Sequence, residues 1–309
     1  MFIQMKRPVG VTLEDTKDTH MCLCLGSILT PSTIACSICM REYHQECIRI
    51  PANEVFECPY CFIQDMDPIH EVVETLFTGY VRAEDTIHNF RFSLKEADLS
   101  NPRHQVEMRC IRLDGKNNYE LTWPDYGYVK LNENKIADFK PLINNSSLKR
   151  RKDEPKIVER RMLRSIGDNF AQMTVMPPQL KEQVRISVTN HMVGIFVIKL
   201  NTPNEVVERL RYNIISEQES RQILLEQMSP LDEITIERLD VSLECVFSME
   251  PIRIPVRSKE CRHFNCFDLN MMVTTTTKSQ PRRWRCPICK RKAQLLVVDR
   301  ILPNIIQEN

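Results

Sequence analysis

The sequence predicts a multidomain protein in which two small metal-stabilised modules flank a globular domain built from β-strands. Thirteen cysteines occur in 309 residues, and all but Cys110 fall within residues 22–61 and 245–289. Their tight pairing, their odd number and the lack of a visible export signal favour metal binding over disulfides. Between the clusters, runs of apolar and β-branched residues favour strands.

Composition and charge exclude several classes of protein. Lys+Arg (42) and Asp+Glu (41) nearly cancel, which excludes a globally basic nucleic-acid coat but allows local basic patches. Residues 1–11 carry no long apolar segment of the kind found in a secretory signal. No apolar run approaches the ~20 residues that cross a bilayer. We therefore expect a soluble intracellular protein with no membrane contact.

The N-terminal cluster consists of four closely spaced pairs of metal-ligand residues. The pairs are Cys22 and Cys24, Cys36 and Cys39, His44 and Cys47, and Cys58 and Cys61. Zinc takes four such ligands in a tetrahedron, and a short turn presents two of them at once. Eight ligands predict two closed zinc sites with no open position for catalysis. The segment is too small for a core of its own, so the metal must supply folding free energy.

This spacing resembles a PHD finger, over residues 18–66. The resemblance implies two interleaved sites, one made of Cys22, Cys24, His44 and Cys47 and the other of Cys36, Cys39, Cys58 and Cys61. Phe56 stands where the family usually has Trp. PHD fingers often read histone tails, so a histone tail is a candidate partner. A methyl-lysine pocket needs free aromatic faces, whereas we expect Tyr43 and Phe56 to be structural.

The C-terminal cluster fits a RING template in which two of the eight metal ligands are missing. The template positions are Cys245, Ser248, Cys261, His263, Cys266, Leu269, Cys286 and Cys289. In a RING the two sites interleave, which leaves one complete site made of Cys261, His263, Cys286 and Cys289. The other site would include Leu269, which cannot coordinate a metal. The sequence thus predicts one zinc ion here and three in the chain, with Cys245 and Cys266 acting as small buried apolar residues.

This pattern, over residues 239–305, resembles the SP-RING (MIZ-type) finger of the Siz/PIAS family of SUMO E3 ligases. The motif residues around Cys261, His263 and Cys286 carry the resemblance, as do residues 297–299. It implies a ligase that binds a SUMO-charged E2 and promotes acyl transfer to substrate lysines. The resemblance implies that Phe247, Pro287 and Ile288 contact the E2. Val246 and Phe247 depart from the family's usual Pro and aliphatic residue.

No residue is expected to be catalytic, because no side chain pairs a nucleophile with its own base. The implied partners are therefore the E2, SUMO and protein substrates, which the chain would bring together. The alternative hypothesis is a non-catalytic chromatin or transcription adaptor, which the departure at Val246 and Phe247 favours. A ubiquitin ligase is disfavoured, since the half-metal RING is typical of SUMO machinery.

The segment between the clusters predicts a β-sandwich over residues 85–202. Strands are expected at residues 105–113, 126–131, 184–188 and 192–200. A helical linker is expected over residues 203–238, opening with an Asn204 cap and reaching about residue 228. The order of strands, helix and zinc module resembles the PINIT domain that precedes the SP-RING in Siz/PIAS proteins, which implies a role in choosing the substrate.

The sequence contains two basic stretches, residues 149–164 and 278–292, and does not decide their roles. Each could be a solvated loop, and the first could also serve nuclear import or contact an acidic partner. The second could meet SUMO, the E2 or DNA. The family resemblance and the first stretch together predict a nuclear protein.

Overall fold

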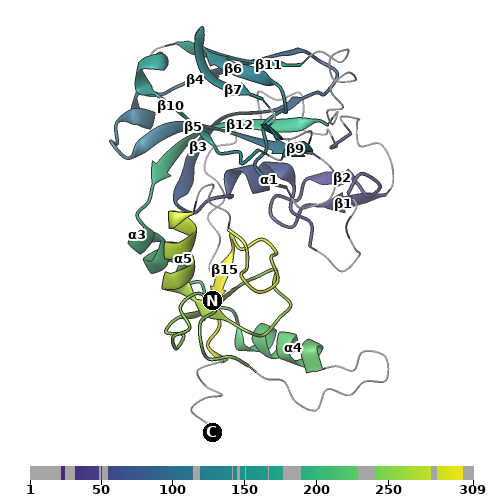
Figure 1. The fold of residues 1–309 in the computed structure, drawn as a ribbon, viewed down its shortest axis with the longest axis vertical. Coiled ribbons are helices and arrows are strands. Elements are labelled where there is room, and N and C mark those ends of the chain that lie inside the picture. Colours follow the sequence, from purple (N-terminus) through teal and green to yellow (C-terminus); the bar gives the residue numbers. More distant parts are fainter. Residues whose placement is uncertain are drawn as a thin grey trace. The chain divides into compact units, whose positions relative to one another are not determined.

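The structure of the chain is a computed structural model, drawn in Figure 1. It describes residues 22–24, 32–48, 50, 55–113, 119–140, 142–144, 147–149, 151–165, 167–176, 189–228, 241–279 and 284–301. The chain divides into two compact units, the first made of Met1–Asp65 and His70–Leu200 and the second of Met66–Ile69 and Asn201–Asn309. Among the described residues, no helix has the length and apolar character needed to cross a membrane.

The first unit begins with a small finger. Its strands β1 (Thr33–Ala35) and β2 (Glu42–His44) pair antiparallel, and helix α1 (Pro59–Gln64) follows. Pro59 suits the first turn of α1, where its missing N–H is not needed. Tyr43 and Phe56 are buried and meet edge to face with ring centroids 5.2 Å apart. Both rings therefore serve as the finger's core, as expected, and neither forms an aromatic cage.

A β-sandwich makes up the rest of the first unit, and it confirms the predicted fold class. One sheet has the strand order β10-β5-β12-β3 and the other β4-β11-β6-β7, with antiparallel pairing throughout. The strands are β3 (His70–Val81), β4 (Ile87–Ser93), β5 (His104–Arg112), β6 (Gly127–Leu131), β7 (Asn134–Phe139), β10 (Lys156–Val158), β11 (Asp168–Val175) and β12 (His191–Leu200). The hairpin of β8 (Leu142–Asn144) and β9 (Ser147–Lys149) and the 3-10 turns η1 (Glu96–Leu99) and η2 (Arg160–Met162) complete the unit.

Alternation along the strands decides which side chains enter the core between the sheets. In β4 every second residue is buried, so Phe90 and Phe92 point inward while Asn89 and Arg91 face out. They join buried residues of both sheets in one apolar cluster that includes Met108, Trp123, Leu131, Met173 and Ile195. Strand β12 is buried along almost its whole length, because it lies between β5 and β3 and packs against α1 on its other face.

The sheet starts earlier in the chain than expected. Strand β3 precedes the range 85–202 and pairs with β12 from His70 to Val81. Its residues are mostly half-buried, and its sequence lacks the regular apolar–polar alternation that reveals a strand. The strands expected at 105–113, 126–131 and 192–200 are confirmed as β5, β6 and β12. The strand expected at 184–188 lies outside the described residues.

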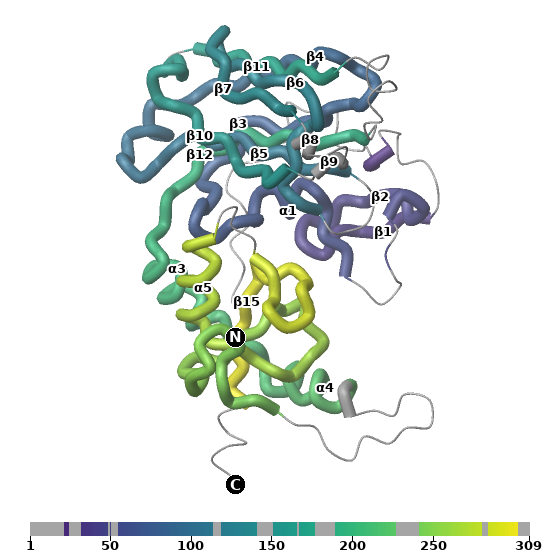
Figure 2. The backbone as a smooth tube through the Cα atoms, in the orientation of Figure 1, coloured from purple at the N-terminus to yellow at the C-terminus, as the bar shows by residue number. Residues whose placement is uncertain are grey.

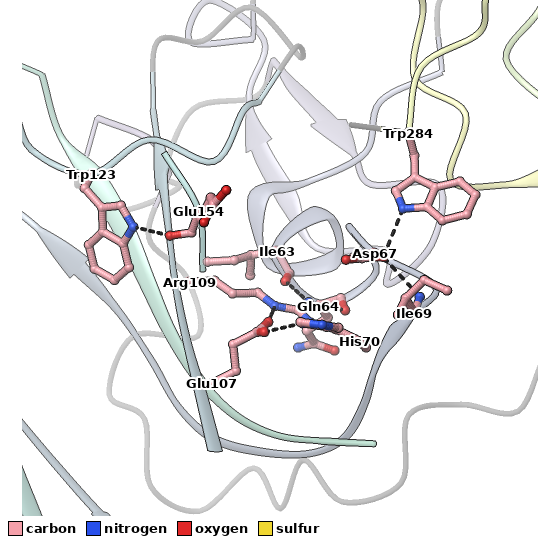
Figure 3. A network of polar contacts seen from close by, with 10 residues as sticks. All are labelled: Ile63, Gln64, Asp67, Ile69, His70, Glu107, Arg109, Trp123, Glu154 and Trp284. Atoms are coloured by element: carbon pink, nitrogen blue, oxygen red, sulfur yellow. Dashed lines mark hydrogen bonds and ion pairs between the residues drawn. The ribbon is translucent and has the colours of Figure 1, made fainter. Parts of the chain in front are cut away.

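A buried arginine joins the finger to the sandwich (Figure 3). Arg109 of β5 donates from Nη1 to the carbonyl oxygens of Ile63 and Gln64, both at 2.8 Å, at the end of α1. Its Nη2 donates to the carbonyl of His70 at 2.7 Å, and its Nε donates to Glu107 at 2.6 Å. Glu107 also contacts the His70 ring. Burial disfavours the Glu107 carboxylate, but Arg109 and His70 outweigh it and hold the pKa of Glu107 below its usual range.

The second unit contains α3 (Pro203–Leu210), α4 (Glu217–Met228), β13 (Pro255–Ser258), β14 (Phe267–Asp268), α5 (Leu269–Lys278) and β15 (Leu296–Val298). The three strands form one antiparallel sheet in the order β14-β13-β15. Figure 2 shows α3 running beside α5. Val206 and Val207 of α3 join the core of this unit, so α3 is part of it rather than a free linker.

The cap of α3 differs from the expected one. Thr202, and not Asn204, is the N-cap: its hydroxyl accepts a hydrogen bond from the Glu205 N–H, and the Glu205 side chain accepts one from the Thr202 N–H. This capping box with Pro203 in the first turn fixes the start of the helix.

The short segment Met66–Ile69 is built into the second unit. The Asn201 N–H donates to the Ile69 carbonyl at 2.9 Å, and Arg209 donates to the Pro68 carbonyl at 3.1 Å. The indole N–H of Trp284 donates to Asp67 at 3.0 Å (Figure 3). The C-terminal module therefore needs residues that precede the sandwich in the chain.

Candidate metal centres

The first N-terminal cluster brings together Cys22, Cys24, His44 and Cys47, whose ligand atoms all lie within 4.8 Å of one another. His44 presents Nδ1 to the cluster, 3.5 Å from the Cys24 sulfur and 3.9 Å from the Cys47 sulfur. The His44 N–H donates to the Cys22 sulfur at 3.3 Å. Residue 44 thus supplies both a ligand and a backbone hydrogen bond to a neighbouring ligand sulfur.

The second N-terminal cluster consists of Cys36, Cys39, Cys58 and Cys61. The N–H groups of Ile38 and Cys58 donate to the Cys36 sulfur at 3.5 and 3.2 Å. Hydrogen bonds from Cys39, then Cys58 and Cys61, hold the pKa of Cys36 far below its usual range, while hydrogen bonding to Cys36 raises that of Cys61. Without a cation these four sulfurs cannot all carry charge.

The C-terminal cluster consists of Cys261, His263, Cys286 and Cys289. His263 places Nε2 3.1 Å from the Cys286 sulfur, while Nδ1 lies 2.8 Å from the Asn265 carbonyl, so a proton on Nδ1 leaves Nε2 free for a metal. Hydrogen bonding from Cys261, then from His263 and the backbone, lowers the pKa of Cys286 to about 3 against the effect of burial. This cluster is therefore prepared to hold a thiolate.

The donor sets fit zinc. A tetrahedral ion with Zn–S bonds of about 2.3 Å separates its sulfur ligands by roughly 3.8 Å. The corresponding separations are 3.9 Å for Cys36 and Cys61, 3.5 Å for Cys39 and Cys58, and 3.7 Å for Cys261 and Cys289. All of these cysteines are free thiols. The three clusters are consistent with three zinc sites, and each offers four protein ligands, which leaves no open position for substrate.

The incomplete half of the C-terminal module is packed and hydrogen-bonded. Cys245, Cys266 and Leu269 are buried, and Ser248 uses its hydroxyl to accept from the Glu250 N–H at 3.3 Å. The Cys245 sulfur accepts from the Asp268 N–H at 3.3 Å. Burial, with a smaller contribution from Asp299, raises the pKa of Cys266 to about 12, so its thiol stays neutral.

A buried ion pair lies in this half of the module, and sequence reasoning missed it. Arg257 and Asp299 are each about 1% exposed and their charged atoms lie 2.8 Å apart. Ser220 of α4 bridges them, donating to Asp299 at 2.5 Å and accepting from Arg257 at 3.2 Å. The pair binds α4 to the strands of the module. Its only sequence signal was Asp299 after an apolar strand, which alone does not identify a partner.

The residues expected to face an E2 differ in their surroundings. Phe247 is half-buried and packs edge to face on Phe267, with ring centroids 6.1 Å apart. Pro287 and Ile288 are half-buried in the turn after Cys286, where the Ile288 N–H donates to the Cys286 sulfur at 3.4 Å. Val246, which sequence reasoning named only as a departure from the family, and Met249, which it overlooked, expose 48% and 72% of their surface close to Phe247 in the chain.

The described part of the first basic stretch holds loops together. Arg151 is paired with Asp153 and donates to the carbonyl oxygens of Trp123 and Pro124 at 3.0 and 3.1 Å. Its charge therefore satisfies backbone groups of the sandwich. In the second stretch Lys290 donates to the Pro287 carbonyl at 2.6 Å, while residues 280–283 lie outside the described residues.

Comparison with known proteins agrees with this geometry. The MIZ/SP-RING zinc finger family model matches residues 241–292, the region that holds the C-terminal cluster. The proteins that the chain matches over this region and beyond it are SUMO E3 ligases of the Siz/PIAS family. It is 23% identical over 311 residues to the E3 SUMO-protein ligase SIZ1 of Arabidopsis thaliana, an alignment that covers 87% of this chain and 33% of that protein.

Further SUMO E3 ligases match over shorter or more distant alignments. The human E3 SUMO-protein ligase PIAS2 is 27% identical over 124 residues, which is 38% of this chain and 20% of that protein. The crystal structure of the S. cerevisiae SUMO E3 ligase SIZ2 aligns with a TM-score of 0.44 at 14% identity, covering 79% of this chain and 92% of that one. The chain spans about a third of the length of the curated SIZ1 relatives.

Proposed function

We propose that this chain is a SUMO E3 ligase of scaffold type that acts in the nucleus. The observation that carries the proposal is a complete Cys/His cluster beside a packed half in which Ser248 and Leu269 replace metal ligands, both within the region that matches the SP-RING model. We propose zinc in all three clusters, with roles in holding surfaces in place. The adjoining apolar residues Phe247, Pro287 and Ile288 are the proposed E2 contact.

The proposed reaction is acyl transfer from the E2 to a substrate lysine. The lysine amine attacks the carbonyl of the SUMO–E2 thioester, a C–N bond forms, the C–S bond breaks, and the E2 cysteine leaves as a thiolate while the amine loses a proton. None of the cysteines is proposed as a relay: Cys110 is fully buried and burial raises its pKa well above the usual value. The ligase would accelerate the step by restricting the thioester to reactive geometry.

The sandwich and the finger would select the substrate. Both belong to one compact unit, in which Arg109 fixes the end of α1 to the sheet. A histone tail remains the proposed ligand class for the finger, without a methyl-lysine cage, since Tyr43 and Phe56 are both almost fully buried. The proposed module boundaries are 18–65 for the finger, 70–200 for the sandwich and 201–305 for the C-terminal module, which also includes Met66–Ile69.

The alternative is a non-catalytic chromatin adaptor. One observation supports it. Phe247 stands where the family usually has an aliphatic contact residue, and its ring packs on Phe267, so part of its apolar surface is not free to contact an E2. The two functions differ in whether the chain changes the rate of thioester discharge.

Reconstitution with purified E1, E2, SUMO and ATP distinguishes them. A ligase accelerates discharge of the SUMO–E2 thioester onto free lysine, and Ile288→Ala abolishes the acceleration with zinc content unchanged. Val73→Ala, which truncates an exposed side chain of the sandwich, is the matched control. Equal discharge with and without the chain would leave the adaptor as the function.

A further inference from the structure

The outer face of the sheet β4-β11-β6-β7 carries two aromatic rings between cations, the exposed Phe170 and the half-buried Tyr128. Phe170 of β11 is 51% exposed, with the Arg91 guanidinium 5.9 Å and the Arg164 guanidinium 6.0 Å from its ring centroid. Tyr128 of β6 has the same arrangement, with Lys130 at 5.2 Å and Lys135 at 5.6 Å. The finger packs on the other sheet of this unit, as Figure 1 shows for α1, so this face is not the finger's support.

The strand register places the two aromatic sites on one surface. Thr174 pairs with Tyr128 across β11 and β6, and Phe170 lies four residues along β11 from Thr174. At strand spacing the two rings are therefore separated by about 13 Å along the sheet. Between them lie Gln172 and Lys130, which pair across the same two strands.

The polar groups between the rings suit a base and a phosphate. Gln172 donates to the Asn89 side chain at 3.0 Å on this outer face. Lys130 and Lys135 pair directly across β6 and β7, where two like charges destabilise a sheet unless an anion lies between them. The acidic residues on the face, Asp168 and Asp138, are already ion-paired with Arg91 and Lys135. Lys130 has no ion-pair partner among the described residues.

We propose that this face binds a single-stranded oligonucleotide, with bases stacked on Phe170 and Tyr128 and the phosphate backbone beside Lys130 and Arg164. Bases stack on exposed aromatic rings regardless of sequence, and cations that line the path contact the backbone. A duplex cannot use this surface because its bases are already stacked on one another. The proposal concerns the sandwich alone and does not depend on ligase activity.

Fluorescence anisotropy with a labelled dT12 oligonucleotide and the full zinc-loaded chain tests the proposal. Phe170→Ala and Tyr128→Ala should each weaken binding by about tenfold, from the typical contribution of one stacked base. Phe170→Leu should weaken binding as much as Phe170→Ala. Leucine keeps an apolar side chain of similar size but offers no ring face on which a base can stack. Val73→Ala, an exposed truncation on the other sheet, should bind like the wild type.

Charge variants give a second readout. Lys130→Gln should lower the slope of log K against log salt by about 0.7, as expected for one phosphate contact to a single strand. A labelled U12 oligonucleotide separates RNA from DNA as the source of the strand, and binding of either supports the proposal. Unchanged thermal unfolding shows that the variants are folded.

Three results would overturn the proposal. The first is no binding of either oligonucleotide at low salt. The second is wild-type affinity in Phe170→Leu and Tyr128→Ala, which would leave only a charge effect. The third is equal affinity for poly-glutamate of the same charge, which would show that an acidic protein segment is the occupant.

Discussion

The indole N–H of Trp284 donates a hydrogen bond to Asp67 Oδ1 at 3.0 Å, across 217 residues of sequence. Both side chains are almost fully buried, and the same Asp67 oxygen accepts from the Ile69 N–H at 3.0 Å. A buried indole N–H needs such a partner, since leaving it unsatisfied costs the full desolvation penalty. The SP-RING therefore depends on a segment that precedes the whole sandwich.

Asp67→Ala should lower the free energy of unfolding of the C-terminal unit by about 1–3 kcal/mol, because the Trp284 and Ile69 N–H groups lose their acceptor. Urea unfolding followed by Trp fluorescence measures the change. Asp65→Ala, at an exposed carboxylate two residues away, is the control and should change stability much less. Equal stability of the two variants would show that Trp284 does not need Asp67.

Glu107→Gln should destabilise the first unit by about 3–5 kcal/mol at neutral pH, because it leaves the buried Arg109 guanidinium without its carboxylate. The pKa of Glu107 is depressed in the fold, so its contribution is complete above the unfolded pKa of about 4.3 and is lost as pH falls through the lower folded value. The difference between wild type and variant should therefore shrink below about pH 4.

Urea unfolding at several pH values measures this difference. Glu84→Gln is the matched control, because Glu84 is 76% exposed and its pairing with Arg82 at 4.0 Å is a surface contact. If the difference in unfolding free energy between Glu107→Gln and wild type stayed constant down to acid pH, the assigned ion pair would be contradicted.

Variants in the two halves of the C-terminal module should differ in their zinc content. Cys261→Ala should lose one zinc ion of three and unfold the module, because a site with three ligands no longer closes the tetrahedron. Cys245→Ala should keep all three ions and cost on the order of 1 kcal/mol, because it removes only a small buried side chain. Metal analysis of the purified variants is the measurement. Four ions in the wild type, or loss of one from Cys245→Ala, would show a second metal in this module.

Phe247→Ala and Ile288→Ala should differ in how they affect the chain. Phe247 packs on Phe267 and the core, so its truncation should lower stability as well as E2 binding, with about 0.5–1.5 kcal/mol from the ring pair alone. Ile288→Ala should lower E2 affinity by more than 1 kcal/mol and should cost less stability than Phe247→Ala, because Ile288 packs on the same core without an aromatic ring pair. Calorimetric titration with E2 and thermal unfolding of each variant make the comparison. Unaltered E2 affinity in both would move the contact to Val246 and Met249.

Much of the metal chemistry could be predicted from the sequence, because only one or two residues separate the two members of a ligand pair. A short turn brings such a pair together by itself. The spacing around Cys36 and Cys39, or around Cys286 and Cys289, is therefore visible without a fold. Leu269 likewise shows in the sequence that one RING position cannot bind metal. The central strands were also predictable, since β12 is a long apolar run and β5 alternates apolar and polar residues from Val106 to Cys110.

Tertiary structure alone decided the long-range polar contacts. Nothing in the residues around Asp67 indicates Trp284, and nothing around Arg109 indicates the carbonyl groups that end α1, because a buried donor and its acceptor meet only once distant segments have packed. Strand β3 was missed for a different reason: its residues are mostly half-buried on both faces, so its sequence carries little periodic signal. Local spacing thus determined which residues gather around a metal, whereas packing over hundreds of residues determined which module each segment stabilises.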